Sequence, residues 1–160
     1  MDGEGERPSR NHGCLSCERA ALPDQPPRER VLVTDHWRVA HAFDTSLPGW
    51  LVVLPHEHVA SLSELSEPAA LELGPLLSGL SRALERVTGC TKAYVLFLAE
   101  AEGFSHVHLH VVPRMPDQPP EERGPRIFSR LGRPDAERVP SAEMDALAGR
   151  IAAALSTAVD

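Results

Sequence analysis

The sequence predicts an α+β fold: a mostly antiparallel sheet of about five strands, one long central helix and a C-terminal helix. Three observations support this prediction. The 160 residues are enough for one domain with its own core. Short apolar or alternating segments, bounded by turn residues, flank a long segment with helical spacing. Two of the short segments follow each other across a tight connection, which favours antiparallel pairing.

The elements can be placed along the chain from these patterns. The central helix is expected to begin at Ser66, with an acid and a proline in its first turn, and to stop at Gly89. Pro75 should kink it. A final amphipathic helix follows Ser141. Strands are expected at RVLVTD (30–35), HWRVAHAF (36–43), WLVVLP (50–55), KAYVLFLAE (92–100) and HVHLHVVP (106–113).

The chain divides into four parts. Residues 1–13 lack an apolar pattern and are predicted to be a flexible tail. Residues 14–115 form the domain, and residues 116–140 are rich in Pro and Arg and are predicted to be a long loop or wrapping segment. Residues 141–160 contain the last helix.

The composition excludes several classes of partner. The chain has 16 Lys and Arg against 23 Asp and Glu, a net charge of −7, which disfavours nucleic-acid binding but allows a small phosphorylated ligand. The polar first twenty residues exclude a signal peptide, and no apolar run approaches the ~20 residues needed to span a bilayer. We therefore expect a cytoplasmic protein with no membrane partner.

Three of the eight histidines stand within five residues, in FSHVHLHVVPR (104–114). Side chains two apart on a strand share a face, so His106, His108 and His110 are predicted to point one way and the intervening apolar residues the other. Three interpretations follow from these residues alone. They are a metal site with an open position, an imidazole nucleophile helped by its neighbours, or a polar strand edge without chemistry. The strict alternation disfavours the last.

These residues resemble the histidine triad (HIT) family of nucleotide hydrolases, whose motif is HxHxHxx with apolar residues at x. HVHLHVV (106–112) matches that motif. GWLVVLPHEHV (49–59) is similar to the family's apolar strand ending in Pro-x-x-His, and CLSC (14–17) is similar to its N-terminal CxxC. HWRVAHAFD (36–44) resembles the strand before its nucleotide-binding loop.

The resemblance implies a homodimer and a mechanism. The middle histidine, His108, would attack the α-phosphorus of a nucleotide, and water would then release a nucleoside monophosphate. His110 would contact the phosphate and assist the leaving group, while His106 would support the site. A backbone carbonyl would accept the other N–H of His108. Catalysis would need no metal. Transferase relatives carry Gln at the last position, so His110 points to hydrolysis.

Further residues are candidates for nucleotide binding. Asp44 lies where family members place an acid that binds ribose hydroxyls, and a carboxylate can accept two such bonds. The family's phosphate-binding Asn loop and Gln-Ser pair are replaced by AEAEGFS (99–105), which carries two glutamates. Backbone N–H groups around Gly103, or the hydroxyl of Ser105, would then bind the phosphate. A base pocket is a further expectation, with core packing as the alternative for each of Trp37, Phe43 and Leu54.

Cys14 and Cys17 form a CxxC that, by itself, is also compatible with a redox pair or two incidental thiols. The resemblance implies structural zinc bound by Cys14, Cys17, His58 and His106, with His56 as a rival for His58. A closed zinc site needs four such ligands. If His106 binds zinc, it cannot also act as an acid in catalysis.

The sequence therefore predicts a hydrolase of nucleoside 5′-phosphate derivatives: a dinucleoside polyphosphate, a phosphoramidate or an adenylylated metabolite. Two alternatives remain open. One is a nucleotide-binding regulatory or scaffold protein with little turnover. The other is a metalloenzyme that uses the histidine cluster as catalytic ligands.

Overall fold

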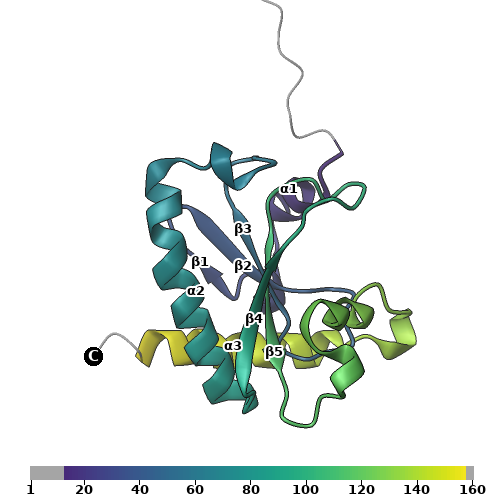
Figure 1. Cartoon of the computed structure of the whole chain (residues 1–160). Coiled ribbons are helices and arrows are strands. Elements are labelled where there is room, and N and C mark those ends of the chain that lie inside the picture. The colour runs from purple at the N-terminus through teal and green to yellow at the C-terminus, as the bar shows by residue number, and fades with distance from the viewer. Residues whose placement is uncertain (1–12, 158–160) are drawn as a thin grey trace, which may run out of the picture.

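The computed structural model describes residues 13–157, so all of the predicted tail except Gly13 lies outside the described residues. The described strands form one antiparallel sheet of five strands in the order β1-β2-β3-β5-β4 (Figure 1). The α+β class and the antiparallel sheet are confirmed. The strands are β1 (Leu32–Val33), β2 (Trp37–His41), β3 (Leu51–Pro55), β4 (Lys92–Phe97) and β5 (Leu109–Arg114).

The long central helix, α2 (Glu67–Thr88), begins and ends where the sequence predicts. Ser66 precedes it, and Gly89 adopts a left-handed conformation with φ 72° at its end, which glycine tolerates without strain. Pro75 lies inside α2, and the helix continues through it. The last helix, α3 (Ser141–Ser156), crosses α2 near the C-terminal end of α2 (Figure 1).

The sequence did not predict a third helix, α1 (Leu15–Ala20), which has six residues and contains the second cysteine of the CxxC. Helices this short are marginal alone and need tertiary contacts. A backbone hydrogen bond from Leu15 N–H to the carbonyl of Gly103, 3.3 Å long, supplies one such contact. None of the helices in the described part of the chain is both long and apolar enough to cross a membrane.

Helices α2 and α3 cover one face of the sheet and form the main core with it. Leucines of α2 recur at helical spacing and pack against strand residues that point to the same face. Each fully buried aliphatic side chain contributes about 1.5–3 kcal/mol relative to exposure. The fully buried members of this core are Trp37, Val39, Leu51, Val53, Leu80, Leu84, Val107, Val111 and Ile151.

The opposite face of the sheet carries a smaller core, and this face positions the candidate site. It consists of Ala42, Trp50, Val112 and Ile127, with Phe128 packed against them. Ile127 and Phe128 come from the Pro/Arg-rich segment, which folds as three 3₁₀ helices: Pro120–Glu122, Gly124–Arg130 and Asp135–Glu137. The segment predicted to be a long loop or a wrapping segment therefore packs against the sheet through Ile127 and Phe128.

Candidate functional site

The three alternating histidines do not serve one site. Strand β5 begins only at Leu109, so His106 and His108 lie before the strand and not on it, where the sequence had predicted them. The predicted alternation holds on the apolar side, because Val107, Leu109 and Val111 are all buried in the main core. The ring of His106 lies against that of His58, with centroids 4.9 Å apart. The rings of His108 and His110 lie against each other, with centroids 5.0 Å apart, and both line a cavity.

His108 is oriented by the backbone of its own motif. Its Nδ1 lies 2.8 Å from the carbonyl oxygen of His106. A carbonyl can only accept, so Nδ1 carries the proton and Nε2 is the nitrogen with a free lone pair. Nε2 has no hydrogen-bond partner among the described residues, and the side chain lines the cavity. This is the orientation that a nucleophilic imidazole requires.

His110 has the opposite arrangement. The indole N–H of Trp50 donates to Nδ1 of His110 over 3.0 Å, and the two rings meet edge to face at 89°. Nδ1 is therefore unprotonated, and the proton of the neutral ring sits on Nε2. Burial, reinforced by the charge of nearby His108, lowers the pKa of His110 to about 4. At neutral pH, His110 is a neutral hydrogen-bond donor.

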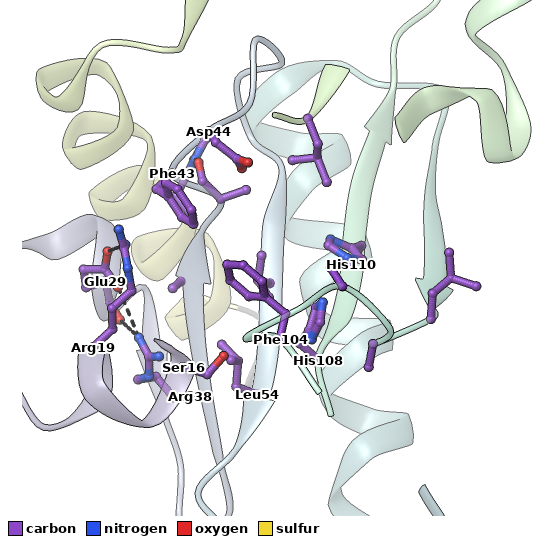
Figure 2. Close-up of a pocket in the computed structure, with 18 of the residues that line it drawn as sticks. Ser16, Arg19, Glu29, Arg38, Phe43, Asp44, Leu54, Phe104, His108 and His110 are labelled. Carbon is purple, nitrogen blue, oxygen red and sulfur yellow. Dashed lines mark hydrogen bonds and ion pairs between the residues drawn. The ribbon is translucent and has the colours of Figure 1, made fainter. Parts of the chain in front are cut away.

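The cavity beside these two histidines has a volume of about 450 Å³, enough for a nucleotide-sized ligand. Figure 2 shows His108 and His110 on one side of it. Phe104 lies beside them, with its ring centroid 6.3 Å from that of His108. The loop that carries Phe104 also contributes Glu100, and Ala99 in this loop has a positive φ of 51°.

The other side of the cavity is charged (Figure 2). Glu29 bridges two arginines, with Oε1 2.7 Å from Arg19 and Oε2 3.3 Å from Arg38. Arg38 is only 6% exposed, and burial lowers its pKa despite Glu29. The guanidinium of Arg19 lies 4.1 Å above the ring of Phe43. Ser16 of α1 is buried and lines the same wall.

Asp44 lies in this cavity, as a ribose-binding acid would. One of its carboxylate oxygens, Oδ2, accepts from the N–H of Gly132 over 3.1 Å, so the wrapping segment fixes its position. The other proposed nucleotide contacts lie elsewhere. Ser105 is exposed and does not line the cavity, nor does Gly103, whose carbonyl accepts from Leu15.

Of the three residues predicted for a base pocket, two line the cavity and one does not. Phe43 and Leu54 line the cavity. Trp37 is fully buried in the main core, where its indole N–H donates to the carbonyl of Ala69 over 2.9 Å. His41, a residue that the sequence did not single out, lines the cavity but donates to Ala42 O and accepts from the N–H of Gly49.

A separate cluster unites the four residues expected to bind zinc. One ligand atom from each of Cys14, Cys17, His58 and His106 lies within 4.8 Å of the other three. The sulfur of Cys17 lies 3.3 Å from Nδ1 of both histidines. His56, the rival of His58, is exposed and interacts with the carbonyl of Thr34 instead. His108 and His110 belong to no such cluster within residues 13–157.

The donor set and its protonation fit zinc, which structural sites hold with four cysteine and histidine ligands in a tetrahedron. Nε2 of His106 lies 3.0 Å from the carbonyl of Pro55, so Nε2 carries the proton and Nδ1 is left to bind a metal. Burial and the neighbouring Cys14 raise the pKa of the Cys17 thiol to about 11. A divalent cation would reverse this by favouring the thiolates.

Sequence reasoning also missed Ser16 and Phe128, which line the cavity, and Trp50, which contacts His110 from outside it. Trp50 looked like the first residue of an apolar strand, and Ser16 looked like a spacer within the CxxC. Phe128 comes from the segment that the resemblance does not cover, yet its ring lies 5.1 Å from that of His110. The sequence gives no sign that these side chains contribute to the site, because only the fold brings them to the same face of the sheet.

No protein-family model matches this sequence, and none of the curated proteins searched matches it. Solved structures do. A zinc-bound histidine triad family protein from Mycobacterium smegmatis shares 16% identity, with a TM-score of 0.66 over 91% of this chain and 94% of that one. A hypothetical histidine triad nucleotide-binding protein from Sulfolobus tokodaii shares 15% identity, with a TM-score of 0.68 over 90% and 93%.

A uridylyltransferase structure also matches, with 20% identity and a TM-score of 0.64 over 94% of this chain and 48% of that one. Identities this low establish the architecture rather than the activity. The structural neighbours extend over the C-terminal region, which the sequence resemblance did not cover. The chain therefore has the fold of the histidine triad proteins.

Proposed function

We propose that the protein hydrolyses nucleoside 5′-phosphate derivatives through a nucleotidyl-histidine intermediate on His108. One observation supports this most directly. The carbonyl of His106 fixes the proton of His108 on Nδ1, and the unprotonated Nε2 belongs to a side chain that lines a nucleotide-sized cavity. Positioning of this kind converts a weak nucleophile into an effective one because attack needs no reorientation or proton loss.

The remaining cavity residues then have defined roles. His110 donates its Nε2–H to a phosphoryl oxygen, which gains negative charge in the transition state. Asp44 accepts from the ribose hydroxyls through the carboxylate oxygen that Gly132 does not engage. Phe43 and Leu54 contact the base, beside the donors of Arg19 and Arg38.

The Cys14, Cys17, His58 and His106 cluster would bind zinc as a structural ion. It would tie the N-terminal segment and α1 to the residues before β5. Zinc held there would polarise only its own ligands, and the chemistry would remain with His108 and His110. His106 contributes to catalysis only through its backbone carbonyl in this scheme.

A single-turnover experiment tests the hydrolase. Purified protein is mixed with diadenosine tetraphosphate or with adenosine 5′-phosphoramidate, quenched, and analysed by intact mass. We expect an AMP-sized adduct and AMP release with at least one of the two compounds. Both should disappear in His108→Ala and persist after chelation. Loss of activity on chelation, with the fold intact, would favour the metalloenzyme instead.

One observation favours a nucleotide-binding regulatory protein as the second candidate. The loop before the triad carries Glu100 into the cavity, while Gly103 and Ser105 do not line it. The phosphate therefore meets a carboxylate where hydroxyl and amide donors were expected. Nucleotide binding without adduct or AMP from either compound would support this candidate.

We also propose a homodimer that forms through strand β4. This strand is at the edge of the sheet, with one side of its backbone unpaired within the described chain. Val95 is 45% exposed and Leu98, just beyond the strand, is 64% exposed. Apolar edge strands of this kind invite pairing with a second copy. Light scattering should give twice the chain mass for the protein and a smaller mass for Val95→Lys.

A further inference from the structure

The hydrogen bond between Trp50 and His110 lies behind the cavity wall, because His110 lines the cavity and Trp50 does not. Both side chains are buried, Trp50 completely and His110 to within 7% of full burial. The bond is 3.0 Å long and joins the residue before β3 to the second residue of β5. An indole N–H can only donate, so this contact determines which nitrogen of His110 is unprotonated.

This contact also determines whether His110 can act as an acid. To give a proton to a leaving group and remain neutral, His110 would first have to carry protons on both nitrogens. A proton on Nδ1 would point at the N–H of Trp50, placing two donors against each other in a buried site. The hydrogen bond would break, and the indole N–H would lose its partner.

The surroundings hold the Trp50 ring in this position. Phe128 packs edge-on against both rings, 5.8 Å from Trp50 and 5.1 Å from His110, and the cluster is closed by Val112 and Ile127. Of the ionisable groups near His110, His108 is in ring contact, so a positive charge on either ring would oppose one on the other. The other ionisable groups lining the cavity are Arg19, Glu29, Arg38, His41, Asp44 and Glu100.

We infer that Trp50 is a positioning residue that keeps His110 a neutral donor, so that the enzyme acts on substrates whose leaving group departs as a stable anion. This inference rests on the proposed function and narrows its substrate class. Phosphoanhydrides and mixed acyl-phosphate anhydrides have such leaving groups. Phosphoramidates of alkylamines and esters of alcohols do not, because an amine or alkoxide must be protonated as it leaves.

Every bond that forms or breaks in the proposed reaction can be accounted for without a general acid. Attack by the lone pair on Nε2 of His108 forms the P–N bond, and the P–O bond to the leaving group breaks. The leaving oxygen keeps the electron pair as an anion, while His110 keeps its proton and donates only a hydrogen bond. Water then attacks phosphorus, the P–N electron pair returns to Nε2, and a proton passes from the water to solvent.

A leaving-group series tests the inference. The substrates share adenosine 5′-phosphate and differ in the departing group: diadenosine tetraphosphate, aryl esters with phenols of graded pKa, and an alkylamine phosphoramidate. For the unmodified protein, we expect kcat/KM to fall roughly tenfold per unit of leaving-group pKa among the aryl esters. The phosphoramidate should be at least about 100-fold slower than diadenosine tetraphosphate, the range that a missing general acid accounts for.

Two matched tryptophan variants isolate the hydrogen bond. Trp50→Phe removes the N–H that reaches His110, and we expect the ratio between diadenosine tetraphosphate and phosphoramidate to narrow by at least about 10-fold. Turnover of the phosphoramidate should also gain a rise towards acidic pH, because Nδ1 can then take a proton. Trp37→Phe removes an equally buried indole N–H, bonded to Ala69 O, and should leave the ratio unchanged.

Nitrogen-15 NMR of the histidine rings gives a readout independent of turnover. His110 should show the Nε2–H tautomer and no titration above about pH 5 in the unmodified protein, and should titrate at higher pH in Trp50→Phe. Equal turnover of both leaving-group classes, or an unchanged ratio in a Trp50→Phe protein whose His110 now titrates, would overturn the inference alone. Inertness towards the whole series would overturn the hydrolase and its leaving-group preference together.

Discussion

His106 and His110 lie four residues apart and belong to sites of opposite character. His106 is surrounded by thiols and another imidazole, and it does not line the cavity that His108 and His110 share. His110 lines an open cavity of about 450 Å³. What separates their roles is the partner of the second ring nitrogen: Pro55 O for His106 and the N–H of Trp50 for His110. Both residues are histidines, and the hydrogen-bond partner of each ring determines which ring nitrogen is protonated and which is not.

The largest expected effect tests the cavity side of this comparison. His108→Ala should lower turnover by about 10⁴-fold or more, because the attacking nitrogen is lost. Nucleotide affinity, measured by calorimetry with AMP, should change by less than about tenfold since the other contacts remain. A variant that keeps its turnover would show that the nucleophile lies elsewhere.

The next effect tests the metal side. Cys17→Ser should abolish stoichiometric zinc binding and lower the free energy of unfolding by on the order of 3 kcal/mol, because ligand binding to the native state stabilises it. Elemental analysis and urea unfolding measure the two quantities. Cys90→Ala, a buried cysteine outside the cluster, is the control and should keep its zinc. Equal zinc content in Cys17→Ser would remove this residue from the ligand set.

A smaller effect appears with pH. Burial holds the pKa of His110 at about 4, below the ~6.5 of an unfolded chain, so the unfolded state gains this proton first as the pH falls. Stability from this group is complete above about pH 6.5 and is lost as the pH approaches 4, on the order of 3 kcal/mol in all. Urea unfolding at several pH values should show a steeper acid loss for the natural protein than for His110→Gln. Parallel curves would contradict the assignment.

The smallest expected effect concerns the charged wall. Arg19→Gln should weaken AMP binding about three- to tenfold, because one hydrogen-bond donor and the packing on Phe43 are lost. The matched control is Arg28→Gln. Arg28 also pairs with one carboxylate, that of Asp145 at 2.8 Å, but does not line the cavity. Equal affinities for both variants would show that the ligand does not reach this wall.

Local patterns were enough to predict the five strands and the two long helices, but not helix α1. The start and stop of α2 are marked within one turn, by Pro68 in the first turn and by the left-handed Gly89 at the end, so both are visible in the sequence. Helix α1 was not visible because six residues are too few for a periodic pattern, and its stability comes from contacts with the loop at Gly103.

In the candidate site, too, some features could be predicted from the sequence and others could not. The cluster of Cys14, Cys17, His58 and His106 could be predicted only through the resemblance, since Cys14 and His106 are separated by 92 positions along the chain. The orientation of each imidazole could not be predicted from the sequence, because it depends on single atoms of partners such as Trp50. An apolar strand that starts with Trp predicts burial, and only the register that places Val52 opposite His110 makes the indole a neighbour of the triad.

The distance in sequence between the proposed zinc ligands has a consequence for synthesis on the ribosome. Cys14 and Cys17 emerge early, whereas His106 follows some ninety residues later, about 5–20 s at usual elongation rates. Until then, the two thiols have no complete ligand set and are open to oxidation or to other metals. Closing so long a loop also costs more chain entropy than a local contact. The cluster should therefore be among the last parts of the molecule to mature, and the supply of zinc during translation should influence how much correctly assembled protein a cell obtains.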